Sequence, residues 1–138
     1  MTNLKYLKEL IETKSFDTKN NEKIVEYLMK SFGTCSKEII KINNNLNDKN
    51  NLLIGLNCNL KNLNDAIILS GHMDTVIADE SSYKTNPYSA TIIEDNLFGL
   101  GSIDMKSFFA TILNNIKELK NLNSPHRNSN YFWWRNYI

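Results

Sequence analysis

The chain has 138 residues, of which 41% are hydrophobic and 22% charged, a composition that suits a packed domain rather than a disordered chain. Lysine and arginine number 16 against 15 acidic residues, so the net charge of +1 offers no broad field for nucleic acid or an anionic membrane. The sequence lacks a run of about 18 apolar residues that could span a membrane. Its start, MTNLKYLKEL, lacks the apolar core of a secretion signal, so we expect a cytoplasmic protein.

The N-terminal part of the chain predicts two amphipathic helices. Apolar residues recur at helical spacing over residues 3–13 and again over residues 20–32, with charged residues between them. Gly33 follows the second segment at the position where a helix C-cap glycine belongs. We therefore expect two short helices with one apolar face each.

Three strands are predicted to follow, over residues 37–42, 51–56 and 65–70. Residues 43–51 are polar and predict a turn between the first two strands. The third strand is a nearly continuous apolar run, which is typical of a strand that is buried on both faces.

The rest of the chain predicts a polar loop over residues 71–88, short β segments at 91–93 and 96–98, and a helix from 105 to 120. The order of helices, strands, loop and helix predicts an α/β fold in which a central mixed sheet is flanked by helices.

The first polar cluster, SGHMDTV at residues 70–76, comes directly after the third predicted strand. Ligands of open α/β sheets bind outside the carboxyl ends of strands, and a neutral histidine ring can bind a divalent metal. Asp74 shares a face with His72 in an extended chain, so its carboxylate could accept the second ring N–H and orient the imidazole. Taken alone, His72 is more often a polar loop residue and Asp74 a turn carboxylate.

The second polar cluster is GLGSIDMK at residues 99–106, where two glycines permit a tight turn. Asp104 would stand at the start of the third helix, where a carboxylate either caps backbone N–H groups or bridges two metal ions. The third glycine of a dinucleotide-binding fingerprint is missing, and neither cluster has the HExxH spacing of helical zinc peptidases.

Together the two clusters resemble, in order and spacing, the two N-terminal signatures of the M20 family of metallohydrolases. The likeness covers roughly residues 3–124, and the segment Asn86-Pro87-Tyr88 also resembles the family pattern. Leu100 and the phenylalanines that follow the second cluster look most like the acetylornithine deacetylase branch. Two alternatives stay open: another M20 amidohydrolase or peptidase, such as a succinyl-diaminopimelate desuccinylase or an aminoacyl peptidase, and a non-catalytic α/β remnant.

The resemblance implies a site in which His72 binds metal, Asp104 bridges two Zn²⁺ or Co²⁺ ions, and Asp74 orients His72 as a catalytic residue. It implies an N-acyl amino acid as substrate, with N-acetyl-L-ornithine hydrolysed to L-ornithine and acetate in arginine biosynthesis. Intact members of the family are often homodimers.

The resemblance also implies that residues 1–124 are the N-terminal part of a zinc-peptidase-like catalytic domain. The family's Glu-Glu pair, its distal histidine ligand and its lid or dimerisation domain have no counterpart here, so we expect a truncated chain that is inactive alone. Residues 125–138 have neither helical nor strand periodicity. They are interpreted either as an aromatic tail that packs on the domain or as an aberrant, frameshifted tail.

Overall fold

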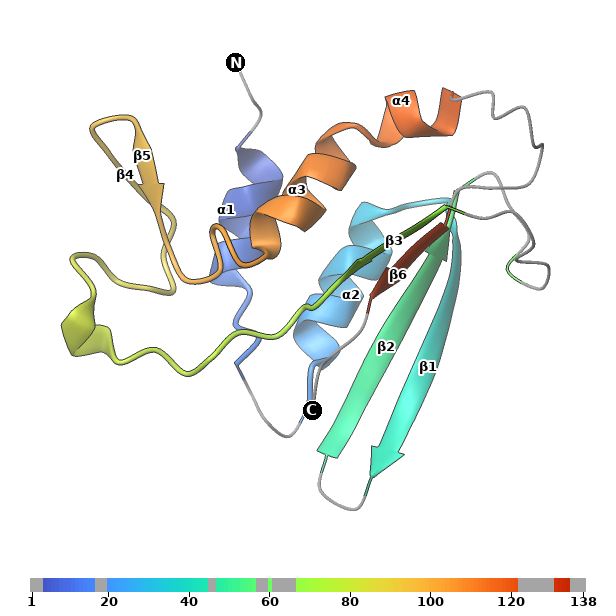
Figure 1. Cartoon of the computed structure of the whole chain (residues 1–138), viewed down its shortest axis with the longest axis horizontal. Helices are drawn as coiled ribbons and strands as arrows, with labels where there is room; N and C mark the ends of the chain where they lie inside the picture. Colours follow the sequence, from blue (N-terminus) through green and yellow to red (C-terminus); the bar gives the residue numbers. More distant parts are fainter. Residues whose placement is uncertain are drawn as a thin grey trace.

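The structure is a computed structural model. It describes residues 4–16, 20–44, 47–56, 60, 67–121 and 131–134, and every structural statement refers to these residues. The chain has an α/β fold in which the helices lie together on one side of a four-stranded sheet, while a small hairpin stands apart (Figure 1). None of the helices in the described ranges is long and apolar enough to cross a membrane.

The two predicted N-terminal helices are confirmed as α1 (Lys5–Glu12) and α2 (Glu22–Ser31). The Tyr27 hydroxyl of α2 donates a hydrogen bond of 2.9 Å to the Glu9 carboxylate of α1. Gly33, at the end of α2, has a φ of 54°, the left-handed conformation that a C-cap glycine adopts without steric cost.

A long antiparallel hairpin follows, formed by β1 (Ser36–Asn44) and β2 (Asn47–Gly55). The predicted polar turn over residues 43–51 is wrong, because most of that segment is strand. Main-chain hydrogen bonds hold the two strands together where the side chains are polar. The Asn21 side chain makes further hydrogen bonds to the β2 backbone. Its amide donates to the Asn50 carbonyl at 2.7 Å, and the Asn50 N–H donates to the Asn21 side-chain oxygen at 2.9 Å.

The main sheet has the order β1-β2-β6-β3. The interior strand β6 (Tyr131–Trp134) is antiparallel to β2 and parallel to β3 (Ile68–Gly71), so the sheet is mixed, as predicted. The strand β6 lies in the segment for which the sequence pattern indicated no strand. Four residues are too few to show a period, although aromatic residues favour strands. Residues 125–130 and 135–138 of the predicted tail, like residues 65–66 of the third predicted strand, lie outside the described residues.

The third predicted strand is not buried on both faces. Ile68 is 54% exposed, whereas Gly71 is buried against Met105 and Phe108. The difference arises because the described helices cover one face of the sheet only, and β3 is its terminal strand.

The predicted short β segments are confirmed as the hairpin of β4 (Thr91–Ile93) and β5 (Asn96–Phe98). A single 3-10 turn, η1 (Glu80–Ser82), interrupts the predicted loop before them.

The third predicted helix is divided at Asn115 into α3 (Lys106–Asn114) and α4 (Ile116–Asn121). The Asn115 side-chain amide donates a hydrogen bond of 2.8 Å to the Thr111 carbonyl, and its backbone N–H is shared between the Thr111 and Ile112 carbonyls. Asparagine competes in this way with regular helical hydrogen bonds, which explains the break.

One hydrophobic core joins the helices to the sheet. Leu52, Ile54 and Leu56 alternate along and just beyond β2 and therefore share one face. Fully burying a large apolar side chain contributes roughly 1.5–3 kcal/mol. The helical side chains of this core are Leu10 of α1, Ile24, Val25 and Leu28 of α2, and Phe109, Ala110, Ile112 and Leu113 of α3.

Candidate metal-binding site

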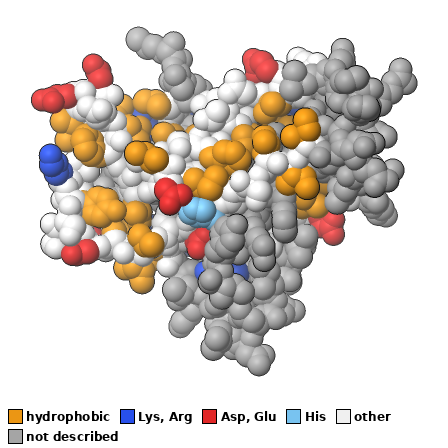
Figure 2. Space-filling model, in the orientation of Figure 1, with side chains coloured by type: hydrophobic (Ala, Val, Ile, Leu, Met, Phe, Trp, Pro, Cys, Tyr) orange, Lys and Arg blue, Asp and Glu red, His pale blue; other side chains and the backbone are white. Residues whose placement is uncertain are grey.

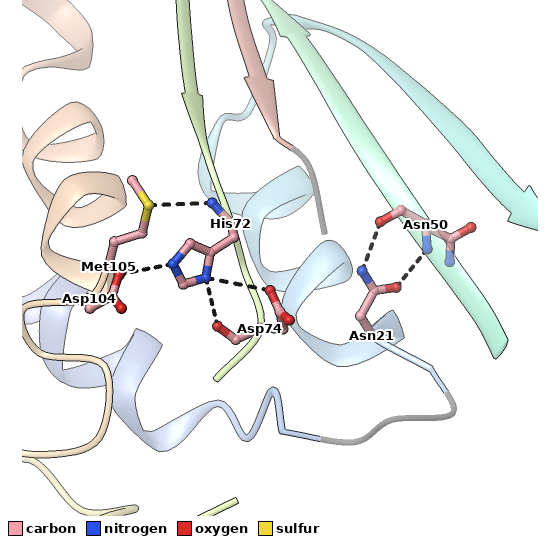
Figure 3. A network of polar contacts seen from close by, with 6 residues as sticks. All are labelled: Asn21, Asn50, His72, Asp74, Asp104 and Met105. Carbon is pink, nitrogen blue, oxygen red and sulfur yellow. Dashed lines mark hydrogen bonds and ion pairs between the residues drawn. The ribbon is translucent and has the colours of Figure 1, made fainter. Parts of the chain in front are cut away.

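His72 stands directly after β3, and both of its ring nitrogens have a hydrogen-bonding neighbour (Figure 3). Nδ1 lies 3.0 Å from the backbone carbonyl of Asp74, and Nε2 lies 2.9 Å from Oδ1 of Asp104. The carbonyl can only accept, so Nδ1 carries a proton. The two polar clusters of the sequence are therefore brought together through one imidazole ring.

A neutral imidazole with its proton on Nδ1 would turn the lone pair of Nε2 toward the Asp104 carboxylate. Such a pair needs a positive charge, either a second proton on the ring or a cation that both groups bind. Burial lowers the pKa of His72, but the hydrogen bonds to Asp104 and to the Asp74 carbonyl, with the charges of both carboxylates, raise it overall. The surroundings of His72 thus favour positive charge at Nε2.

Asp104 reaches His72 from the loop that precedes α3. Its side chain is 82% exposed, and the N-cap residue of α3 is Met105, with no side-chain cap hydrogen bond. The alternative that Asp104 caps the helix is therefore not what the structure shows. Its carboxylate instead faces the imidazole and solvent.

Asp74 lies beside the same ring but contacts it in two ways. Its carboxylate Oδ1 is 3.4 Å from His72 Nδ1, whereas its backbone carbonyl is closer, at 3.0 Å. The same Oδ1 is buried and has no hydrogen-bond partner among the residues that the structure describes. The main-chain carbonyl makes the geometrically better contact, and the orienting role of the carboxylate stays a prediction.

Two glycines allow the Asp104 loop to pack closely. Gly101 has a φ of 77°, and a Cβ there would lie 3.1 Å from both Thr75 and Lys106. A Cβ at Gly99 would lie 2.6 Å from the Ile11 side chain, so the Ile11 side chain would have to shift to admit any other residue. The glycines of the second cluster therefore permit, beside the predicted turn, a close approach of this loop to α1.

Lys106 has a structural role in this region that was not predicted from the sequence. It is 3% exposed, and its ammonium donates to the Thr13 carbonyl at 2.9 Å and to the Ile11 carbonyl at 3.5 Å. Burial lowers its pKa to about 8. The available signal was its position, since Lys106 shares the apolar stripe of α3 with Phe109 and Ala110.

The polar residues open onto a pocket of ≈ 390 Å³. His72 and Asp104 line it together with apolar side chains of Val76, Tyr83 and Ile103. Figure 2 shows hydrophobic side chains gathered on both sides of the acidic and histidine side chains on this face. A molecule that entered would meet both polar residues, among them His72, Asp74 and Asp104, and apolar side chains.

The side chains of His72 and Asp104 in the pocket are chemically suited to form part of a metal site. A histidine nitrogen and a carboxylate oxygen are both ordinary zinc ligands, and 2.9 Å brings them close enough to share one ion. The described residues contain no group of three or more His, Cys, Asp or Glu side chains that could hold a metal ion. The remaining ligands would have to come from outside the described residues.

Comparison with known proteins gives a match to a family model and to individual relatives. The model for Peptidase family M20/M25/M40 matches residues 68–133, from β3 into β6. Among curated relatives, acetylornithine deacetylase of Aliivibrio salmonicida is 33% identical over an alignment of 123 residues that covers 83% of this chain and 30% of the relative. That of Buchnera aphidicola subsp. Acyrthosiphon pisum (strain Tuc7) is 42% identical over 64 residues, 45% of this chain and 17% of the relative.

Solved structures show the same fold. Human carnosine dipeptidase 1 has a TM-score of 0.73 at 17% identity, covering 96% of this chain and 31% of that chain. The M20 family metallo-carboxypeptidase Sso-CP2 from Sulfolobus solfataricus has a TM-score of 0.67 at 18% identity, covering 96% and 30%. The chain thus spans less than a third of these relatives and solved structures.

Proposed function

Because this chain belongs to the M20 family, whose members are generally metal-dependent peptidases, we propose that it supplies the N-terminal half-site of an amide hydrolase of the acetylornithine deacetylase type. The observation that carries the proposal is the contact of 2.9 Å between His72 Nε2 and Asp104 Oδ1 at the mouth of a pocket. Residues from two separated motifs meet there, as a shared ligand pair requires.

The proposed reaction is hydrolysis of N-acetyl-L-ornithine to L-ornithine and acetate, a step of arginine biosynthesis in the cytoplasm. It is supported by the names of the curated relatives, which are acetylornithine deacetylases. The proposed substrate class, small N-acyl amino acids, follows from the same names.

His72 and Asp104 would hold Zn²⁺ or Co²⁺, which lowers the pKa of bound water and polarises an amide carbonyl. The Asp74 carbonyl keeps the proton of His72 on Nδ1, which leaves the lone pair of Nε2 available as a ligand. The Asp104 carboxylate is exposed and would be accessible to a second ion as well. The described residues that line the pocket include no glutamate, so the general base would come from elsewhere.

A second candidate is another M20 amidohydrolase or peptidase. The solved structures with the same fold are a dipeptidase and a metallo-carboxypeptidase, which favours this alternative at the level of the family. A panel of N-acyl amino acids and dipeptides, tested on a longer protein that includes this segment, separates the two. Faster hydrolysis of dipeptides than of N-acetyl-L-ornithine would replace the deacetylase assignment.

The metal-binding part of the proposal is tested by titrating the ¹⁵N-labelled chain with ZnCl₂ and following the His72 imidazole by NMR. Asp104→Asn should weaken zinc binding about tenfold or more, because it removes a charged ligand. Asp95→Asn, in the exposed β4–β5 turn, is the matched control and should leave the affinity unchanged. Equal affinities in the two variants would contradict the assignment of Asp104.

The proposed half-site also predicts no turnover of substrate by this chain, since the two ligands among its described residues fall short of the three or four that catalytic zinc uses. The measurement is release of L-ornithine from N-acetyl-L-ornithine with saturating ZnCl₂ or CoCl₂. Robust turnover by this chain would show that the ligand set is complete without further sequence.

A further inference from the structure

The candidate site is formed by two loops, one with His72 and one with Asp104. Both loops make hydrogen bonds to one short stretch at the end of α1. On the His72 side, the Thr75 N–H donates to the Ser15 carbonyl at 3.3 Å. On the Asp104 side, the Lys106 ammonium donates to the Thr13 carbonyl at 2.9 Å and to the Ile11 carbonyl at 3.5 Å. Residues 11–15 are therefore a common support for two loops that are distant in sequence.

The contact of the Lys106 ammonium with the Ile11 and Thr13 carbonyls is favourable because these carbonyls lie at the C-terminal end of α1. The last carbonyls of a helix have no partner within the helix and carry its partial negative charge, so a cation is favoured there. Lys106 is almost fully buried, and an ammonium buried without acceptors would be very unfavourable. The two carbonyls therefore fix where the ammonium of Lys106 can lie.

The rest of Lys106 is fixed as well. Its N–H donates to the Gly101 carbonyl at 2.8 Å, and its Cγ and Cδ lie 3.2 and 3.1 Å from the position of a Cβ at Gly101. The loop that carries Asp104 is thus closed by one hydrogen bond between Gly101 and Lys106 and packs on the lysine stem. Asp104 lies inside this closed loop, two residues before Lys106.

We propose that Lys106 is a positioning residue that holds Asp104 within reach of His72 by fastening the loop of residues 101–106 to the end of α1. Lys106 is not among the described residues that line the pocket, so its effect is indirect. The expected effect of Lys106 on zinc affinity rests on the proposed function. Its expected effect on the contact between Asp104 and His72 is independent of that function.

The test uses the full chain with His126→Gln, so that His72 is the remaining one of the two histidines. Lys106→Met keeps the apolar stem and removes the donors. Lys106→Arg keeps donors, and Lys117→Met removes an exposed lysine of α4 as the matched control. Fold is checked by circular dichroism at 10 °C, and zinc affinity and the metal-free ¹⁵Nε2 shift of His72 are measured by NMR.

Lys106→Met should keep its fold, weaken zinc binding about tenfold, and move the His72 ¹⁵Nε2 shift away from the control. Lys106→Arg should restore most of the zinc affinity and most of the original ¹⁵Nε2 shift, which a purely steric role would not predict. A folded Lys106→Met with the zinc affinity and the ¹⁵Nε2 shift of Lys117→Met would overturn the proposal. If Lys106→Met is unfolded, Lys106→Gln takes its place with the same two criteria.

The two proposals fail in different ways. If the parent chain binds no zinc, the proposed function fails, and the metal-free ¹⁵Nε2 shift still decides the role of Lys106. If the parent binds zinc and Lys106→Met binds it equally well with an unchanged shift, only the positioning role is lost.

Discussion

The hydrophobic core and the candidate site are built by opposite means. In the core, Leu10, Leu28 and Phe109 are fully buried and contact several neighbours each. In the site, Asp104 is largely exposed and meets His72 through one oxygen and one nitrogen. Burial is not directional and spreads over many contacts, whereas the site depends on single atoms at defined distances. Core substitutions should therefore change stability, and site substitutions should change chemistry with little change in stability.

The largest effect is expected for Phe109→Ala, which removes a fully buried ring from α3. Loss of the burial together with the resulting cavity should lower the free energy of unfolding by about 3–5 kcal/mol. Urea unfolding followed by circular dichroism measures this loss, with Ile103→Ala as control because Ile103 is 87% exposed. A loss below about 1 kcal/mol would show that the core does not hold the helices together as described.

A smaller effect is expected where the core meets the hairpin. Asn21→Ala removes both hydrogen bonds to the part-buried Asn50 backbone, which should cost about 1–3 kcal/mol. Amide hydrogen exchange should become faster at Asn50, while Asn96→Ala, whose hydrogen bond is exposed, changes stability much less. Unchanged protection at Asn50 would mean that the side-chain bridge does not support β2.

The packing of Gly99 against Ile11 joins the two regions, because this glycine belongs to the site loop and the isoleucine to α1. Gly99→Ala should destabilise the chain by about 1–3 kcal/mol, since its Cβ would lie 2.6 Å from the Ile11 side chain. Ile11→Ala should relieve the clash in the double variant. A double-mutant cycle in urea measures the coupling between the two positions. Strictly additive losses of stability would contradict the expected contact between residue 99 and Ile11.

The smallest change in stability is expected for Asp104→Asn, within about 0.5 kcal/mol, because the side chain is mostly exposed. The pKa of His72 should nevertheless fall, since the Asp104 carboxylate is the main group that raises it. A raised histidine pKa stabilises the fold at pH below the unfolded value, and this contribution is lost as pH rises through the folded value. An NMR titration of metal-free His72 that is the same in both proteins would contradict this electrostatic coupling.

The parts of the fold that were predictable from the sequence are those that local pattern defines. Helical spacing located α1 and α2, and the short β segments predicted at 91–93 and 96–98 are β4 and β5, because none of these elements needs a distant partner to be recognised. The polar half of the β1–β2 hairpin was missed because main-chain pairing between the two strands, and not an apolar pattern, sustains it. The interior strand β6 was missed because it pairs with the remote strands β2 and β3.

The candidate site shows the same division. His72 and Asp104 were found as members of two motifs, and the structure brings them together. Lys106 belongs to the second motif, but its role depends on carbonyl groups 93 and 95 residues away in the chain. A main-chain carbonyl carries no side-chain signature, so neither periodicity nor spacing could have identified these acceptors. The same holds for the Asp74 carbonyl that contacts His72.

The interior position of β6 has a consequence for the order in which the chain can fold. β3, which leads into His72, pairs only with β6 among the described strands, and the register joins Ile68 to Tyr131. During synthesis, β2 and β3 would therefore emerge from the ribosome long before the strand that lies between them. Their facing edges would stay open for that interval, which makes them the natural targets of chaperones and of intermolecular strand pairing.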